Sequence, residues 1–232
     1  MNIKSCLSTA VLLLLCSAAF AQDTIPENDF QVWNETTLAI PLIKEKDSKG
    51  KEVDKLTALI IGTLRFGQNR LAFVDERIGG GFDLRLNNNF SFSPTYLYIA
   101  GQPGRFRREF EHRIRFELSY EKKWKTFSIK DRNRVEYRIR NGRDDSVRYR
   151  NRIQLKIPVL RDGKEIFAPM VSNEVYYDFT AKQWSRNDVV AGISKKFNNN
   201  LTAEFFYGWR HNTSGLPRNI NIIGTNLRFR ID

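Results

Sequence analysis

Two histidines and a nearby serine are the residues of this 232-residue chain whose types could support hydrolytic chemistry. His211 lies three residues before Ser214, whereas His112 lies between Phe110 and Ile114 in an alternating apolar stretch. A serine nucleophile needs a base beside it and a third group that orients the base. Because the sequence shows only that His211 and Ser214 are close along the chain, we expect a polar loop there and no catalytic site.

Ligands for a metal ion are also scarce. The two histidines are far apart in the sequence, and both cysteines, Cys6 and Cys16, fall within the first 21 residues. No helical pattern follows Gly79-Gly80-Gly81, so we interpret this run as a bulge or bend in a strand and not as a phosphate-binding loop. The sequence therefore predicts a protein without enzymatic activity, metal ion or cofactor.

The strongest chemical signal is a set of charged rows between residues 106 and 158, in which charged side chains recur at every second position. Most of the bases in these rows are arginines, and the planar fork of arginine suits partly desolvated networks with carboxylates. We expect neighbouring strands to place glutamate opposite arginine. The rows comprise Glu109, Glu111, Arg113, Arg115 and Glu117; Arg132, Arg134, Glu136, Arg138 and Arg140; and Arg148, Arg150 and Arg152.

The elements that must position these rows begin after an export signal. Lys4 supplies a positive start, residues Leu7 to Cys16 form a short apolar core, and Ala19-Phe20-Ala21 has the small residues of a cleavage site. We expect residues 1–21 to be a signal peptide that is removed after Ala21. The mature chain, residues 22–232, then contains no cysteine and forms a single domain.

From residue 29 onward, apolar and polar residues alternate with a period of two, which is typical of β-strands. Clusters of Asn, Gly and Asp separate the strands and favour tight turns. The polar segment from Lys44 to Lys55 is interpreted as a solvated loop. Eleven strands joined by hairpins would form an antiparallel meander, and we predict them near residues 29–42, 56–67, 73–87, 90–101, 106–122, 125–140, 143–158, 165–179, 185–197, 200–211 and 219–231.

Strand length and residue choice favour a barrel embedded in lipid over a soluble sheet. Segments of twelve to seventeen residues exceed the usual length of soluble strands. Tyrosines and tryptophans, among them Trp33 and Tyr176, mostly fall toward strand ends, as interfacial girdles require. The seven arginines of the two central rows would cost on the order of 14 to 28 kcal/mol on a lipid face, which exceeds the stability of a typical fold. We therefore expect the charged rows to line the lumen.

The eleven predicted segments are an odd number. Bacterial barrels usually contain an even number of strands. We therefore expect a split that the pattern conceals, either in residues 70–87 or in the N-terminal strand. The predicted fold is an all-β, antiparallel meander transmembrane β-barrel of ten to twelve strands, with twelve as the preferred number.

Several segments resemble the bacterial family catalogued as domain of unknown function 2490. The resemblance covers nearly the whole mature chain and implies an outer-membrane barrel-like fold, without a known activity or catalytic residue. It rests on residues 29–35 (DFQVWNE), residues 132–138 (RNRVEYR), residues 148–152 (RYRNR) followed by Pro158, and the closing strand with Gly224, Leu227 and Phe229.

Charge distribution shapes the expected function. The net charge is +12, and residues 105–156 contain 18 basic and 8 acidic residues. We expect a porin-like protein of a Gram-negative outer membrane, whose interior is either a filled structural core or a narrow pore that favours anions. Its expected partners are the outer-membrane lipid bilayer, the barrel-assembly machinery and small anionic solutes.

Two alternatives remain open at this point. The first is an outer-membrane lipid hydrolase that uses His211 and Ser214. The second is a soluble periplasmic ligand-binding β-barrel, which would reverse every assignment of inside and outside. Nucleic acid is not an expected partner, because the arginines alternate with glutamate in an exported chain.

Overall fold

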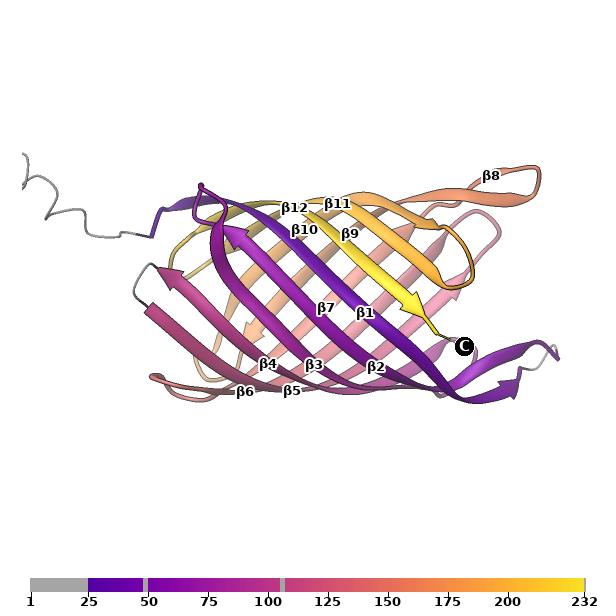
Figure 1. Ribbon diagram of the computed structural model, residues 1–232, viewed down its shortest axis with the longest axis horizontal. Helices are drawn as coiled ribbons and strands as arrows, with labels where there is room; N and C mark the ends of the chain where they lie inside the picture. Colours follow the sequence, from indigo (N-terminus) through magenta and orange to yellow (C-terminus); the bar gives the residue numbers. More distant parts are fainter. Residues whose placement is uncertain (1–24, 48–49, 105–106, 232) are drawn as a thin grey trace, which may run out of the picture.

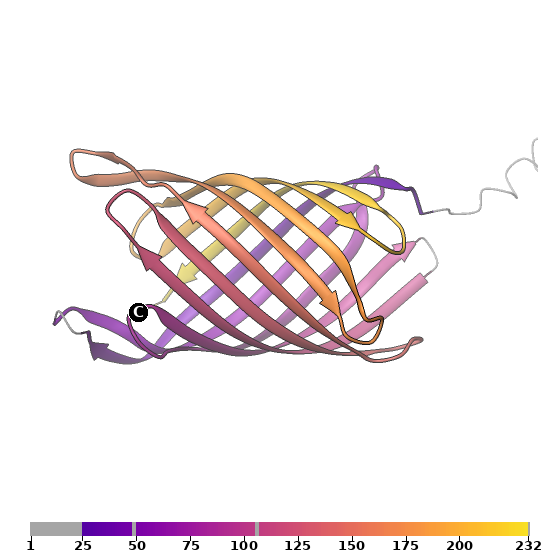
Figure 2. The ribbon, with the colours of Figure 1, turned by 180° about the vertical axis from the view of Figure 1, so that it is seen from behind.

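The computed structural model describes residues 25–47, 50–104 and 107–231, which form a closed β-barrel (Figures 1 and 2). No helix long and apolar enough to cross a membrane occurs in these ranges. The strands are β1 (Asn28–Lys46), β2 (Glu52–Gly67), β3 (Ala72–Arg85), β4 (Phe90–Gly104), β5 (Arg107–Lys123), β6 (Ser128–Arg140), β7 (Ser146–Lys156), β8 (Val159–Arg161), β9 (Lys164–Asp178), β10 (Gln183–Lys196), β11 (Leu201–Asn212) and β12 (Asn219–Arg230).

Eleven of these strands form the barrel wall, and each is antiparallel to its neighbours except where the barrel closes. There β1 pairs with β12 in parallel, from Asn28 opposite Asn219 to Ala39 opposite Arg230. A meander with an odd number of strands must end in the direction in which it began, so its first and last strands can pair only in parallel. We call the two ends of the barrel the N-terminal end, where β1 begins, and the C-terminal end, where β12 ends.

The predicted all-β meander of ten to twelve strands is confirmed, and each of the eleven predicted segments corresponds to one strand of the wall. The expected split is wrong, because β1 and β3 are each continuous. The twelfth strand is instead the three-residue β8, which pairs only with β9 and extends a hairpin beyond the wall (Figure 1). The barrel itself therefore has an odd number of strands.

The expected bulge or bend at Gly79-Gly80-Gly81 is also not observed as a register shift. These residues pair in uninterrupted register with Ile61, Ile60 and Leu59 of β2. A Cβ atom on Gly79 would lie 2.0 Å from the backbone oxygen of Tyr96 on β4. The glycines are therefore explained by the close approach of neighbouring backbones.

The segment from Lys44 to Lys55 is another correction, because most of it extends the β1–β2 hairpin. Only residues 47–51 separate the two strands. Charged side chains pair across the hairpin, with Lys44 Nζ 3.2 Å from Glu52 Oε1 and Lys55 Nζ 3.0 Å from Glu45 Oε2. A polar composition therefore does not prevent strand formation here, because both faces can be solvated and the charges alternate in sign.

The wall presents its apolar side chains outward. On β6, Val135, Tyr137 and Ile139 are each at least 40% exposed, whereas Glu136 between them is fully buried. The same inversion holds around the barrel, because large apolar side chains are exposed on every strand of the wall. Examples are Val32, Ile60, Ile78, Tyr96, Phe116, Ile153, Val171, Ile193, Phe205 and Ile223.

A polar cluster on β6 and β7 interrupts this apolar outer face. Asp131 and Asn133 of β6 lie beside Tyr149 and Asn151 of β7, and all four have partners within the cluster. Asn151 Nδ2 lies 2.7 Å from Asp131 Oδ1, and the Tyr149 hydroxyl lies 2.5 Å from Asn133 Oδ1. Mutual hydrogen bonding lowers the cost of placing polar groups on an otherwise apolar surface.

The parallel closure can be tested with one pair of introduced cysteines. Val32 and Ile223 are Cα partners across the β1–β12 seam, and both are exposed on the outer face. In the mature chain, Val32→Cys combined with Ile223→Cys should form a disulfide under mild oxidation, detected as a mobility change on a non-reducing gel. Phe229 is six residues farther along β12, roughly 20 Å away. The control pair Val32→Cys with Phe229→Cys should stay reduced, and cross-linking of only the control pair would contradict the register.

Candidate functional site

The inner face of the barrel gathers all thirteen residues of the three charged rows. Glu111, Arg113, Arg115, Glu136 and Arg148 are the most buried of them. The others line interior cavities or form ion pairs there, with Glu109 and Arg140 near the N-terminal end. The alternation of β5, β6 and β7 therefore directs three charged rows to one side of the sheet.

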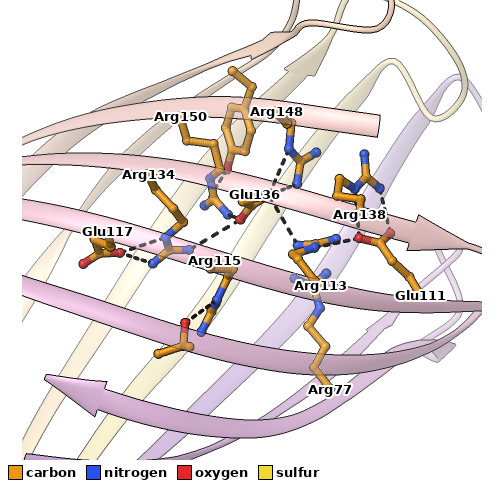
Figure 3. A network of polar contacts seen from close by, with 12 residues as sticks. Arg77, Glu111, Arg113, Arg115, Glu117, Arg134, Glu136, Arg138, Arg148 and Arg150 are labelled. Atoms are coloured by element: carbon orange, nitrogen blue, oxygen red, sulfur yellow. Dashed lines mark hydrogen bonds and ion pairs between the residues drawn. The ribbon is translucent and has the colours of Figure 1, made fainter. Parts of the chain in front are cut away.

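Glu136 is the centre of this network (Figure 3). Its carboxylate is fully buried, and Arg148 donates two hydrogen bonds to Oε2 at 3.0 and 2.5 Å. Arg150 donates to Oε1 at 2.7 Å, while Arg113 and Arg134 lie 3.8 and 3.7 Å away. Four guanidiniums from three adjacent strands thus surround one carboxylate.

Two further carboxylates of β5 extend the network toward the two ends of the barrel. Glu111 accepts hydrogen bonds from Arg113 at 2.7 Å and from both sides of the Arg138 fork at 2.8 Å. Glu117 accepts two hydrogen bonds from Arg134, one of them at 2.8 Å. The expected pairing of glutamate with arginine between these strands is therefore present, although several pairs are diagonal to the strand register.

The network continues on strands where the sequence analysis did not identify it. Glu174 on β9 accepts from Arg132 at 2.8 Å and from Arg150 at 2.9 Å. Asp188 on β10 binds Arg210 on β11 through two hydrogen bonds of 2.7 and 2.6 Å. On β3, Asp75 binds Arg77 in the same way, and Arg65 of β2 lies 3.8 Å from it. Each of these charged residues is isolated in the sequence and belongs to no long charged row. Their inward position could have been predicted only from the alternation of side chains along each strand.

Two aromatic residues that we expected in the interfacial girdles lie inside the barrel instead. Tyr176 is 2% exposed, and its hydroxyl lies 2.7 Å from Asp188 Oδ2 and 3.1 Å from Arg150 Nη2. Trp33 lies beneath two guanidiniums, with Arg65 Cζ 3.7 Å and Arg210 Cζ 4.5 Å from its ring centroid. The parity of Trp33 with Gln31, and of Tyr176 with Glu174, places both rings on the inner face.

The described residues enclose cavities at both ends and at the centre of the barrel. The cavity at the N-terminal end has a volume of about 410 Å³, the central cavity about 130 Å³ and the cavity at the C-terminal end about 350 Å³. Arg150, Tyr176 and Arg210 line both the N-terminal and the central cavity, and Arg132 and Arg152 line both the central and the C-terminal cavity. The central cavity is therefore the smallest of the three.

Cations dominate the central cavity. Its walls carry three carboxylates, Glu35, Glu174 and Asp188. The same walls carry eight arginines: Arg65, Arg77, Arg115, Arg132, Arg134, Arg150, Arg152 and Arg210. The arrangement presents an excess of guanidinium donors to any solute that reaches the centre.

The residues considered for hydrolysis do not meet in a triad. His211 is on the outer face with Nδ1 2.8 Å from Asn219 Oδ1, whereas Ser214 lines the N-terminal cavity. His112 is also on the outer face, with Nδ1 2.6 Å from the Tyr96 hydroxyl. Among the residues that the structure describes, no group of three His, Cys, Asp or Glu side chains is arranged to hold a metal ion.

Comparisons with known proteins found solved structures that match at low sequence identity. No curated protein matches the sequence. A solved structure described as a NanC porin is 11% identical with a TM-score of 0.45, covering 84% of this chain and 93% of that chain. An anion-selective porin from Comamonas acidovorans is 12% identical with a TM-score of 0.37, covering 78% of this chain and 57% of that chain.

The family is shown by the sequence itself. The matching region, residues 30–220, runs from the start of β1 into β12 and includes every charged row described above. The chain therefore belongs to the family described as "Protein of unknown function (DUF2490)".

Proposed function

We propose that this protein is a porin-like β-barrel of the bacterial outer membrane and that its arginine-lined interior passes small anions. The single observation that carries the proposal is the inverted wall. Apolar side chains cover the outside, while charged side chains fill the inside. A lipid bilayer stabilises this arrangement, and water would not.

Energy supports the membrane location. Exposed apolar side chains occur on all eleven strands of the wall, far more than a soluble protein leaves in scattered positions. The arginines point inward, where each avoids the cost of about 2 to 4 kcal/mol for a cation at the bilayer midplane. Both features follow from one choice of which face meets lipid.

Charge supports the choice of anions. The N-terminal cavity is lined by ten arginines and four carboxylates, and the C-terminal cavity by five basic and three acidic residues. Together with the central cavity, every section of the interior therefore carries an excess of positive charge. Rings of Arg and Lys favour anions over cations in pores.

Size limits the solutes. The central cavity of about 130 Å³ has room for only a few water molecules or one small anion. Arg150, which is paired with Glu136, also lines this cavity. A fully filled barrel that does not conduct is therefore the second candidate, and conductance separates the two.

The membrane location predicts a fractionation result. The mature protein should be recovered with the outer membrane, and it should migrate faster on a denaturing gel when unboiled than when boiled, because a closed barrel resists unfolding. Recovery in the soluble periplasmic fraction, with no such mobility difference, would contradict the proposal.

The pore predicts a conductance result. Purified protein inserted into a planar bilayer should give small, discrete conductance steps, and the reversal potential in a salt gradient should show preference for anions over cations. Detergent without protein is the control. A silent bilayer would support the filled barrel, and a preference for cations would contradict the role of the arginines.

A further inference from the structure

The arginines inside the barrel divide into two groups by their partners. Six of the eight arginines around the central cavity have a carboxylate within 4.0 Å, whereas Arg115 and Arg152 have none among the described residues. In the N-terminal cavity Arg186 and Arg140 likewise have no carboxylate within that distance, but the Arg140 guanidinium donates to the backbone oxygen of Asp144 near the end of the barrel. Charges this deep are normally paired, so Arg115, Arg152 and Arg186 require an explanation.

Arg115 has the most restricted environment of the three. Its side chain is 6% exposed, and its Nε donates to Thr95 Oγ1 at 2.9 Å (Figure 3). No described protein acceptor binds either Nη group, and the residue lines the central cavity. Two donors of a buried guanidinium therefore remain for a ligand.

Arg186 and Arg152 continue this arrangement toward the two ends of the barrel. In the N-terminal cavity, Arg186 donates to Asn212 Oδ1 at 2.7 Å and lies with its Cζ 5.4 Å from the centre of the Tyr176 ring. Arg152 lines both the central and the C-terminal cavity. Strand register separates the Cα atoms of Arg115 and Arg152 by two strands and four residues, about 16 Å, and only Arg152 also lines the C-terminal cavity, which places the two on different parts of the wall.

We propose that Arg186, Arg115 and Arg152 are three successive binding sites for small oxyanions, such as carboxylates and phosphate, along the axis of the barrel. This inference rests on the proposed anion pathway and names the class of solute. A guanidinium fork binds two oxygens of one anion, a geometry that chloride cannot match.

The same geometry keeps binding weak enough for release. Each site offers one unpaired guanidinium, and Glu35 lines the central and C-terminal cavities beside Arg115 and Arg152. Passage through a pore needs several sites that each hold the ion loosely. The paired arginines are poorer sites, because a carboxylate within 4.0 Å already offsets the charge of each.

The test is calorimetric titration of inorganic phosphate into the detergent-solubilised protein, with Arg115→Gln, Arg152→Gln and Arg186→Gln as single variants. Loss of one charge-assisted contact should raise the dissociation constant of the affected site by about tenfold. Arg115→Lys keeps the charge without the fork, so it should restore little of the phosphate affinity. Circular dichroism and the gel mobility shift confirm that each variant is folded.

Two matched variants control for the lost charge. Arg138→Gln removes a charge from the same wall, but Arg138 is paired with Glu111, which keeps Arg113 as a partner. Arg161→Gln removes an exposed charge on β8, outside the barrel. Both should leave the phosphate affinity within about twofold of the unsubstituted protein, because Glu111 holds the donors of Arg138 and Arg161 is a solvated charge outside the barrel.

The outcomes separate this inference from the proposed function. Weaker binding in the three variants, with both controls unchanged, would support the sites. Equal binding in all variants, or equal weakening by Arg138→Gln, would overturn them. If phosphate binds as expected but the planar bilayer shows no conductance, the binding sites are supported and the pore is contradicted. If the protein conducts anions but the three variants bind phosphate as tightly as the unsubstituted protein, only the binding sites are overturned.

Discussion

Burial of the Glu136 carboxylate is the constraint on which the rest of the interior depends. An isolated charge removed from water is costly, so a fully buried carboxylate requires cationic partners with good geometry. The barrel supplies four guanidiniums, from Arg113, Arg134, Arg148 and Arg150, on three adjacent strands. Because these arginines in turn contact Glu111, Glu117 and Glu174, one buried charge fixes the positions of side chains over much of the wall.

The same network divides the arginines by role. Those with carboxylate partners link neighbouring strands and narrow the lumen, and Tyr176 and Trp33 add rings against which several guanidiniums lie. Arg115, Arg152 and Arg186 contribute charge without such partners. We therefore assign stability to the arginines that have carboxylate partners and anion binding to Arg115, Arg152 and Arg186. Substituting the arginines one at a time distinguishes these two roles.

Much of the wall could be predicted from the sequence, because strict alternation on β5, β6 and β7 fixes both the strands and the face that carries charge. The odd number of strands could not be predicted in this way. It depends on the parallel pairing of β1 with β12, which joins residues almost 200 positions apart in the sequence. Trp33 and Tyr176 were misplaced because residue type was weighed above parity. Arg65, Arg77 and Arg210 were missed because a lone inward charge forms no row.

A double-mutant cycle on Glu136 and Arg148 tests the central claim most directly, with unfolding by urea in detergent micelles as the measurement. Glu136→Gln should lower the free energy of unfolding by about 3 to 5 kcal/mol, because it leaves buried guanidiniums without their shared partner. The double variant with Arg148→Gln should lose less than the sum of the single variants by more than about 1 kcal/mol. A change below about 0.5 kcal/mol for Glu136→Gln, or additive effects, would contradict a network centred on this carboxylate.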